Sequence, residues 1–159
     1  MLQGELQLVT VEGPGRQFTA KSHSGHTLIL DDATGNGGAR PMEVALLALG
    51  GCTAFDVIGI LRKKRQTVTG YRVELRAEQR EEPPRYFTRV EIRHYLRGRI
   101  DPEAVRRAIE LSETKYCSVS AMMAHTTRIE HTFEIEPEED TKPSTEGTHG
   151  ENPLRSAGA

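Results

Sequence analysis

The segment from Arg40 to Gln66, RPMEVALLALGGCTAFDVIGILRKKRQ, is the longest apolar stretch of the chain and predicts one long helix. Pro41 suits the first helical turn, because its missing N–H would find no partner there and its φ already fits a helix. Apolar side chains then cover most of the circumference, and a basic run over 62–65 complements the negative end of the helix dipole. The pattern favours a central core helix.

Length alone would let this helix cross a bilayer, since roughly 25 residues measure about 37 Å. Glu43 and Asp56 interrupt the apolar run, so we expect a buried helix and no membrane association. The sequence shows no signal peptide, so a cytoplasmic location is expected. The two cysteines are then expected to be thiols, because disulfide scaffolds belong to secreted proteins.

Gly50 and Gly51 precede Cys52 near the middle of the predicted helix. Each glycine costs about 1 kcal/mol of helix stability relative to alanine, so we expect another backbone or a substrate to approach the thiol closely there. Tight packing around an inert cysteine is the alternative, because free cysteine is among the most buried residue types. For a cysteine considered alone, this alternative is the commoner case.

Composition predicts one folded domain over residues 1–136 and an acidic, disordered tail over 137–159. The net charge is −2, and the tail holds five acidic and two basic side chains, so the rest of the chain is near +1. That surplus is too small for a nucleic-acid-binding protein. The basic run over 62–65 could bind an anion, but a solvated helix end explains it more simply.

Turn residues and alternating apolar residues predict six strands, over residues 6–11, 16–22, 26–31, 69–79, 86–96 and 127–135. The fourth and fifth strands should pair as a hairpin ending at Gly98, with Phe87 on the same face as Arg89. The glycine-rich segment 31–38 is a loop without the lysine of a phosphate-binding motif. Asp101 and Pro102 begin a second helix that runs to about Lys115.

Cys117-Ser118-Val119-Ser120 begins a further short helix, which places the Cys117 thiol near a helix N-terminus that favours the thiolate. A buried cysteine packed with core methionines is the alternative. Cys52, Cys117, His125 and His131 are residue types that bind zinc, but their spacing matches no zinc motif, so no metal is expected.

Together these features resemble the family of osmotically induced protein C (OsmC) and organic hydroperoxide resistance protein (Ohr). The resemblance lies in Pro41 followed by an acidic, leucine-rich helix, in Gly50-Gly51-Cys52, in two long strands, and in a helix that leads into Cys117-Ser118-Val119-Ser120. It covers about residues 5–136. It implies an α+β fold with antiparallel sheets wrapped around central helices, and an intertwined homodimer with active sites at the interface.

The chemistry that this resemblance implies is thiol peroxidation without a cofactor. Cys52 would attack an organic hydroperoxide, an alcohol would leave, and the sulfenic acid would condense with Cys117. A dithiol reductant, a lipoyl protein or a thioredoxin-like protein, would then reduce the disulfide. The Cα atoms of the two cysteines must therefore come within about 4.4–6.8 Å. The expected apolar walls of the site are Leu46, Leu49, Phe55, Met122 and Met123.

Departures from the family pattern concern the groups that would activate Cys52. The family places a carboxylate directly after the proline, where this chain has Met42, and the acid follows at Glu43. Glu43 is the candidate for the carboxylate that orients an arginine, and Arg16 is the candidate for the arginine whose positive charge stabilises the Cys52 thiolate. Asp56 lies one helical turn beyond Cys52 and would raise the thiol pKa unless it is itself paired.

Two other classes of function therefore stay open. A redox sensor would use the same cysteines without turnover. A partner-binding domain would hold both thiols buried and inert.

Overall fold

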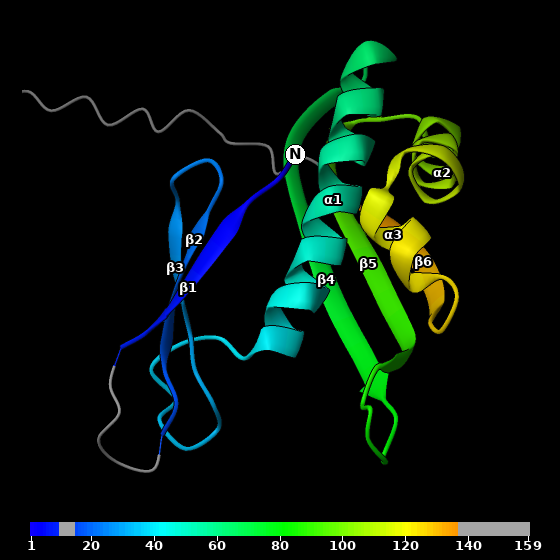
Figure 1. The fold of residues 1–159 in the computed structure, drawn as a ribbon. Helices are drawn as coiled ribbons and strands as arrows, with labels where there is room; N and C mark the ends of the chain where they lie inside the picture. Colours follow the sequence, from blue (N-terminus) through cyan, green and yellow to red (C-terminus); the bar gives the residue numbers. More distant parts are fainter. Residues whose placement is uncertain (10–14, 137–159) are drawn as a thin grey trace, which may run out of the picture.

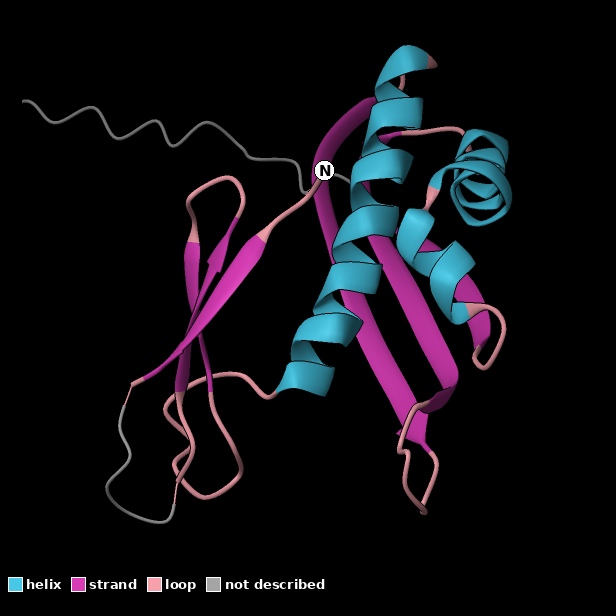
Figure 2. Cartoon of the chain, viewed as in Figure 1, coloured by secondary structure: helices cyan, strands magenta, loops and turns pink. Residues whose placement is uncertain are grey.

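The long apolar segment forms helix α1 (Pro41–Lys63), as predicted, in a computed structural model that describes residues 1–9 and 15–136. The chain order is β1 (Gly4–Leu8), β2 (Phe18–Ser22), β3 (Thr27–Leu30), α1, β4 (Thr67–Gln79), β5 (Phe87–Arg99), α2 (Pro102–Leu111), η1 (Ser112–Tyr116), α3 (Ser118–Met123) and β6 (Arg128–Glu136). The result is an α+β fold (Figures 1 and 2). The tail predicted to be disordered and residues 10 and 11 of the first predicted strand lie outside the described residues.

The first three strands form a separate antiparallel sheet in the order β1-β2-β3. This sheet stands on one side of α1, and the other helices and the second sheet lie on the other side (Figure 1). It leaves large apolar side chains exposed, namely Leu6, Leu8, Leu28 and Ile29. Within one chain this sheet therefore lacks a complete apolar cover.

The second sheet contains the predicted hairpin, in which β4 and β5 pair antiparallel. The hairpin does not end at Gly98, because β5 continues to Arg99. Gly98 lies at a register shift with φ of 131°, and a Cβ there would approach the Thr67 carbonyl oxygen to 2.1 Å. A second register shift, beside Gln79, turns the Phe87 side chain into the core. The prediction that Phe87 and Arg89 lie on the same face of the sheet is therefore wrong.

Strand β6 joins β5 in parallel, so the second sheet is mixed where an all-antiparallel sheet was expected. The chain between β5 and β6 passes through α2, η1 and α3, which return it to the starting end of β5. Parallel strands need such a crossover, usually helical. All three helical segments lie with α1 on one face of this sheet (Figure 2).

Helix α1 buries only one side within the chain. Leu49, Thr53, Val57 and Leu61 are fully buried, each four residues after the one before, so they form one stripe along the helix. Leu47 and Phe55, on other sides of the helix, remain 62% and 82% exposed. By length and composition alone this helix could cross a membrane, and 28% of its most apolar window is buried in the chain. The predicted central packing is therefore only partly present in a single chain.

A buried polar chain separates two apolar clusters on the helix-covered face of the second sheet. The Tyr71 hydroxyl lies 2.8 Å from His94 Nδ1, and His94 Nε2 lies 3.1 Å from His131 Nδ1. Burial lowers the pKa of His94 to about 3, with a contribution from His131, and lowers the pKa of His131 to about 4. Both imidazoles are therefore neutral in the folded protein at pH 7.

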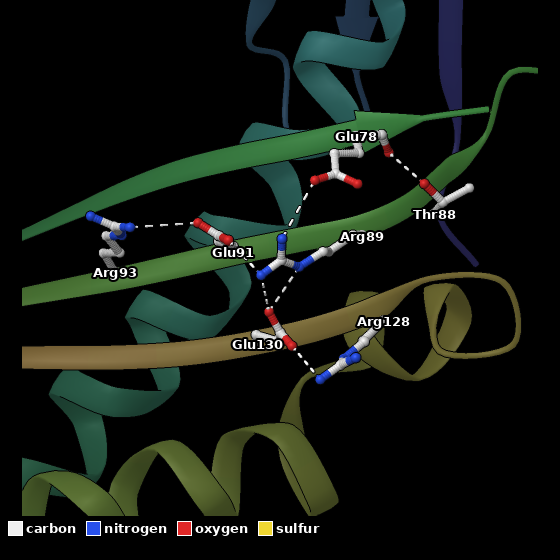
Figure 3. A network of polar contacts seen from close by, with 7 residues as sticks. All are labelled: Glu78, Thr88, Arg89, Glu91, Arg93, Arg128 and Glu130. Carbon is white, nitrogen blue, oxygen red and sulfur yellow. Dashed lines mark hydrogen bonds and ion pairs between the residues drawn. The ribbon is translucent and has the colours of Figure 1, made fainter. Parts of the chain in front are cut away.

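The opposite face of this sheet carries ion pairs within strands and between neighbouring strands (Figure 3). The Arg89 guanidinium lies 2.7 Å from both Glu91 and Glu130 and 3.4 Å from Glu78. Arg89 lowers the pKa of Glu130 through the hydrogen bond between them. Because these charges are partly exposed, the network contributes little to stability but keeps this face solvated.

Candidate functional site

The fold brings the two cysteines together, although they lie 65 positions apart in the sequence. Cys52 lies near the middle of α1, and Cys117 is the N-cap residue of α3. The two sulfur atoms and a carboxylate oxygen of Asp56 all lie within 4.8 Å of one another. Cys52 is partly exposed and Cys117 is 3% exposed. The site therefore contains one accessible thiol and one buried thiol.

A π-helical turn positions Cys117 at the end of the second helix. Segment η1 follows α2 directly, and the Cys117 N–H donates to the Ser112 carbonyl oxygen at 2.8 Å. The sulfur then accepts hydrogen bonds from the Ser120 N–H at 3.3 Å and the Thr53 hydroxyl at 3.6 Å. Single turns of this kind are frequent at functional sites.

The surroundings of the two thiols shift their pKa values in opposite directions. Burial raises the pKa of Cys52, the neighbouring Cys117 adds to the rise, and backbone N–H groups of the α3 N-terminus only partly offset it. Burial acts in the same direction on Cys117, but contacts from Ser120, Cys52 and Thr53 outweigh it and lower the pKa of Cys117. Within one chain, Cys117 is therefore the thiol that ionises more readily, and Cys52 is the thiol that solvent reaches.

Asp56 has a partner of its own. The hydroxyl of Ser112, a fully buried side chain, donates to Asp56 Oδ2 at 3.0 Å. This contact joins the middle of α1 to the start of η1 and fixes the carboxylate beside the thiols. The sequence indicated Asp56 but gave no sign of Ser112.

Neither candidate activating residue reaches the thiols within the chain. Glu43 Oε2 accepts the Arg40 N–H at 2.9 Å, and Glu43 lies nine residues before Cys52, about 14 Å along the helix. Arg16 pairs with Asp32 at 3.2 Å and lines a pocket of about 460 Å³ that includes Pro41, at the first turn of the helix. Both side chains therefore lie near the N-terminal end of α1, away from Cys52.

The expected apolar walls divide into two groups. Leu46, Leu49 and Met123 pack in the same apolar cluster as both cysteines. Phe55 and Met122 are 82% and 71% exposed and contribute to the outer surface. Three of the five expected wall residues thus lie beside the thiols, and two lie on the outer surface of the chain.

The glycines before Cys52 have different environments. A Cβ on Gly50 would lie 2.5 Å from Leu75 Cδ1, so the group that approaches closely is a side chain of β4 rather than a backbone or a substrate. A Cβ on Gly51 would meet nothing within 4 Å. Gly50 therefore serves helix packing, and Gly51 leaves open space beside Cys52.

Among the described residues, the only group of three potential metal ligands comprises Cys52, Asp56 and Cys117. It contains neither His125 nor His131, the two histidines considered as ligands from the sequence. Sequence reasoning missed Thr53, Ser112 and Ser120, which bind Cys117 or Asp56. A possible signal was that small hydroxyl residues stand at core-facing positions of helices that also carry the cysteines.

The fold and this pair of thiols define an OsmC-like protein. The model of the OsmC-like protein family matches residues 34–132, and the chain belongs to that family. Protein YhfA of Escherichia coli (strain K12) is 43% identical over 122 residues, which cover 76% of this chain and 91% of YhfA.

Solved structures agree with this assignment. A hypothetical protein from Aquifex aeolicus is 32% identical with a TM-score of 0.77, over 87% of this chain and 98% of that one. An organic hydroperoxide resistance protein OsmC from Legionella pneumophila is 10% identical with a TM-score of 0.64, over 84% of this chain and 96% of that one, and shows the shared fold.

Proposed function

We propose that this protein is a thiol-dependent peroxidase that reduces organic hydroperoxides to alcohols. The observation that carries the proposal is the pairing of a partly exposed Cys52 with a buried Cys117, whose sulfur atoms lie within 4.8 Å in an apolar cluster. The resistance to organic hydroperoxides named for the Legionella protein supports the same chemistry.

In this mechanism Cys52 attacks and Cys117 resolves. The Cys52 sulfur bonds to the terminal peroxide oxygen, the O–O bond breaks, and the alkoxide leaves as an alcohol after taking a proton. Cys117 then attacks the sulfenic sulfur, and hydroxide leaves as water. The lowered pKa of Cys117 suits this second role, because the attacking group must be a thiolate.

The surroundings of the thiols favour an alkyl or aryl hydroperoxide over hydrogen peroxide. Leu46, Leu49 and Met123 offer apolar contacts to an organic group, and hydrogen peroxide has no such group to bury. A dithiol, from a lipoyl or thioredoxin-like protein, reduces the disulfide by exchange. Such reductants keep cytosolic thiols reduced, which agrees with the expected cytoplasmic location.

A second copy of the chain completes the fold in this proposal. Leu47 and Phe55 on α1, together with Leu6 and Leu28 on the first sheet, present large exposed apolar surfaces in a single chain. Soluble proteins rarely leave such surfaces uncovered unless they mark an interface. Because Arg16 lies far from Cys52 within one chain, any action of its guanidinium on the thiols would come across this interface.

Intact mass and thiol counting test the peroxidase proposal. One equivalent of cumene hydroperoxide should remove both thiols from the reduced protein and lower its mass by two hydrogens, because a disulfide forms. Cys117→Ser should instead stop at a sulfenic acid, with a gain of one oxygen, that dimedone traps. Survival of both thiols after long exposure of the folded protein would overturn the proposal.

A charged substitution on the exposed face of α1 tests whether a second copy of the chain binds there. Phe55→Glu should convert a dimer into a monomer in light scattering, because a buried unpaired carboxylate opposes association. Arg76→Glu, an exposed change on the second sheet, is the matched control and should leave the mass unchanged. A wild-type protein that is monomeric at all concentrations would contradict the expectation.

Redox sensing is the second candidate function. The observation in its favour is the raised pKa of Cys52, which slows attack. A sensor would form the disulfide once and show no turnover with any dithiol.

A further inference from the structure

The proposed reaction leaves open how Cys52 loses its proton. Only a thiolate attacks a peroxide efficiently, and burial keeps the Cys52 thiol protonated. Arg16 and Glu43, the candidates from the sequence, lie at the first turn of α1 or beyond it. Within one chain, a group that takes this proton must therefore come from the residues beside the thiol.

We propose that Asp56 is the general base that takes the Cys52 thiol proton during attack and returns it to the departing alkoxide. The inference rests on the proposed peroxidase function and names the group that performs its proton transfers.

Helix geometry and hydrogen bonding place Asp56 for this role. Residues four apart lie on one helix face, so Cys52 and Asp56 are neighbours on α1, and their ligand atoms lie within 4.8 Å. The Ser112 hydroxyl holds Oδ2, and no other hydrogen bond to Asp56 occurs among the described residues. One carboxylate oxygen is thus available to the thiol, after a small rotation of the cysteine or through one water.

The step balances without an added reactant. The S–H proton moves to Asp56 as the Cys52 sulfur lone pair forms a bond to the terminal peroxide oxygen. The O–O bond breaks, and its electron pair leaves on the alkoxide oxygen. Asp56 then gives its proton to that oxygen, so the products are the Cys52 sulfenic acid, an alcohol and the original carboxylate.

Cys117 is the competing acceptor, because its sulfur also lies within 4.8 Å of the Cys52 sulfur and its pKa is lowered. A Cys117→Ser background removes that acceptor and leaves Cys52 as the only thiol. Asp56→Asn in this background keeps the size of the side chain and an oxygen for the Ser112 hydroxyl. The comparison therefore isolates the basicity of one carboxylate.

Two rates measured at pH 7 test the inference. Sulfenic acid formation with cumene hydroperoxide should fall about 100-fold in Cys117→Ser/Asp56→Asn, within the usual range for general acid–base catalysis. Alkylation by iodoacetamide should be unchanged or faster, because it consumes thiolate already present and its iodide leaving group needs no proton. Glu110→Gln in the same background, on the exposed side of α2, is the control and should alter neither rate.

Each other outcome has a defined meaning. An unchanged peroxide rate, or equal losses in both rates, would overturn the role of Asp56, since equal losses mean a general change at the thiol. Absence of sulfenic acid in Cys117→Ser with Asp56 intact would instead overturn the peroxidase function, and the inference would fall with it. Thermal unfolding of every variant shows whether the fold is kept.

Discussion

Cys52→Ser is expected to lower the rate of organic hydroperoxide reduction by on the order of 10³ or more, as loss of a nucleophile does elsewhere. A serine hydroxyl is a much weaker nucleophile than a thiol near neutral pH and cannot form a sulfenic acid. Peroxide consumption with a dithiol as reductant measures the loss. Because Cys52 is the accessible thiol of the pair, its replacement should remove the first step itself.

Cys117→Ser is the matched variant and should behave differently. The first equivalent of peroxide should still react at Cys52, while turnover through the disulfide should stop, because no resolving thiol remains. The opposite pattern would assign the attack to Cys117, whose thiol has the lower pKa but is only 3% exposed. Stopped-flow measurement of the first turnover separates the two assignments.

Stability is expected to fall steeply as the pH drops below about 6.5, because two neutral histidines are buried. In the unfolded chain His94 and His131 titrate near 6.5, but in the folded protein their pKa values are about 3 and about 4. Between these values the unfolded state binds more protons, so stability is lost as the pH falls. The free energy of unfolding should decrease by roughly 4 kcal/mol from pH 7 to pH 5.

Urea unfolding at several pH values measures this slope. His94→Gln removes one titrating group, keeps an amide for the Tyr71 contact, and should remove about half of the pH dependence. His125→Gln changes an exposed histidine and should leave the slope as it is in the wild-type protein. An unaltered slope in His94→Gln would show that the buried histidines do not govern acid unfolding. The window from pH 7 to 5 lies above the range in which most carboxylates titrate.

Local signals explain why most elements could be predicted from the sequence. Pro41 and the apolar run defined α1. Asp101 defined the start of α2, where its carboxylate accepts the Glu103 N–H at 3.0 Å. Cys117 was correctly placed at the start of a short helix. Each of these features depends on residues within one or two helical turns, so a single sequence contains the information.

Contacts between distant segments of the chain determine the features that the sequence did not predict. The parallel pairing of β6 depends on how three helical segments cross the sheet, and the neutral histidine chain depends on register between three strands. The partners of the thiols also come from distant positions, as Ser112 does for Asp56 and Thr53 does for Cys117.

The sequence by itself determined the family, the two cysteines and the helices that carry them. The tertiary structure alone decided which thiol is accessible, which has the lowered pKa, and that Glu43 and Arg16 lie away from both. The physical reason is that burial and hydrogen bonding set a thiol pKa. Both depend on contacts between segments that are far apart in the chain.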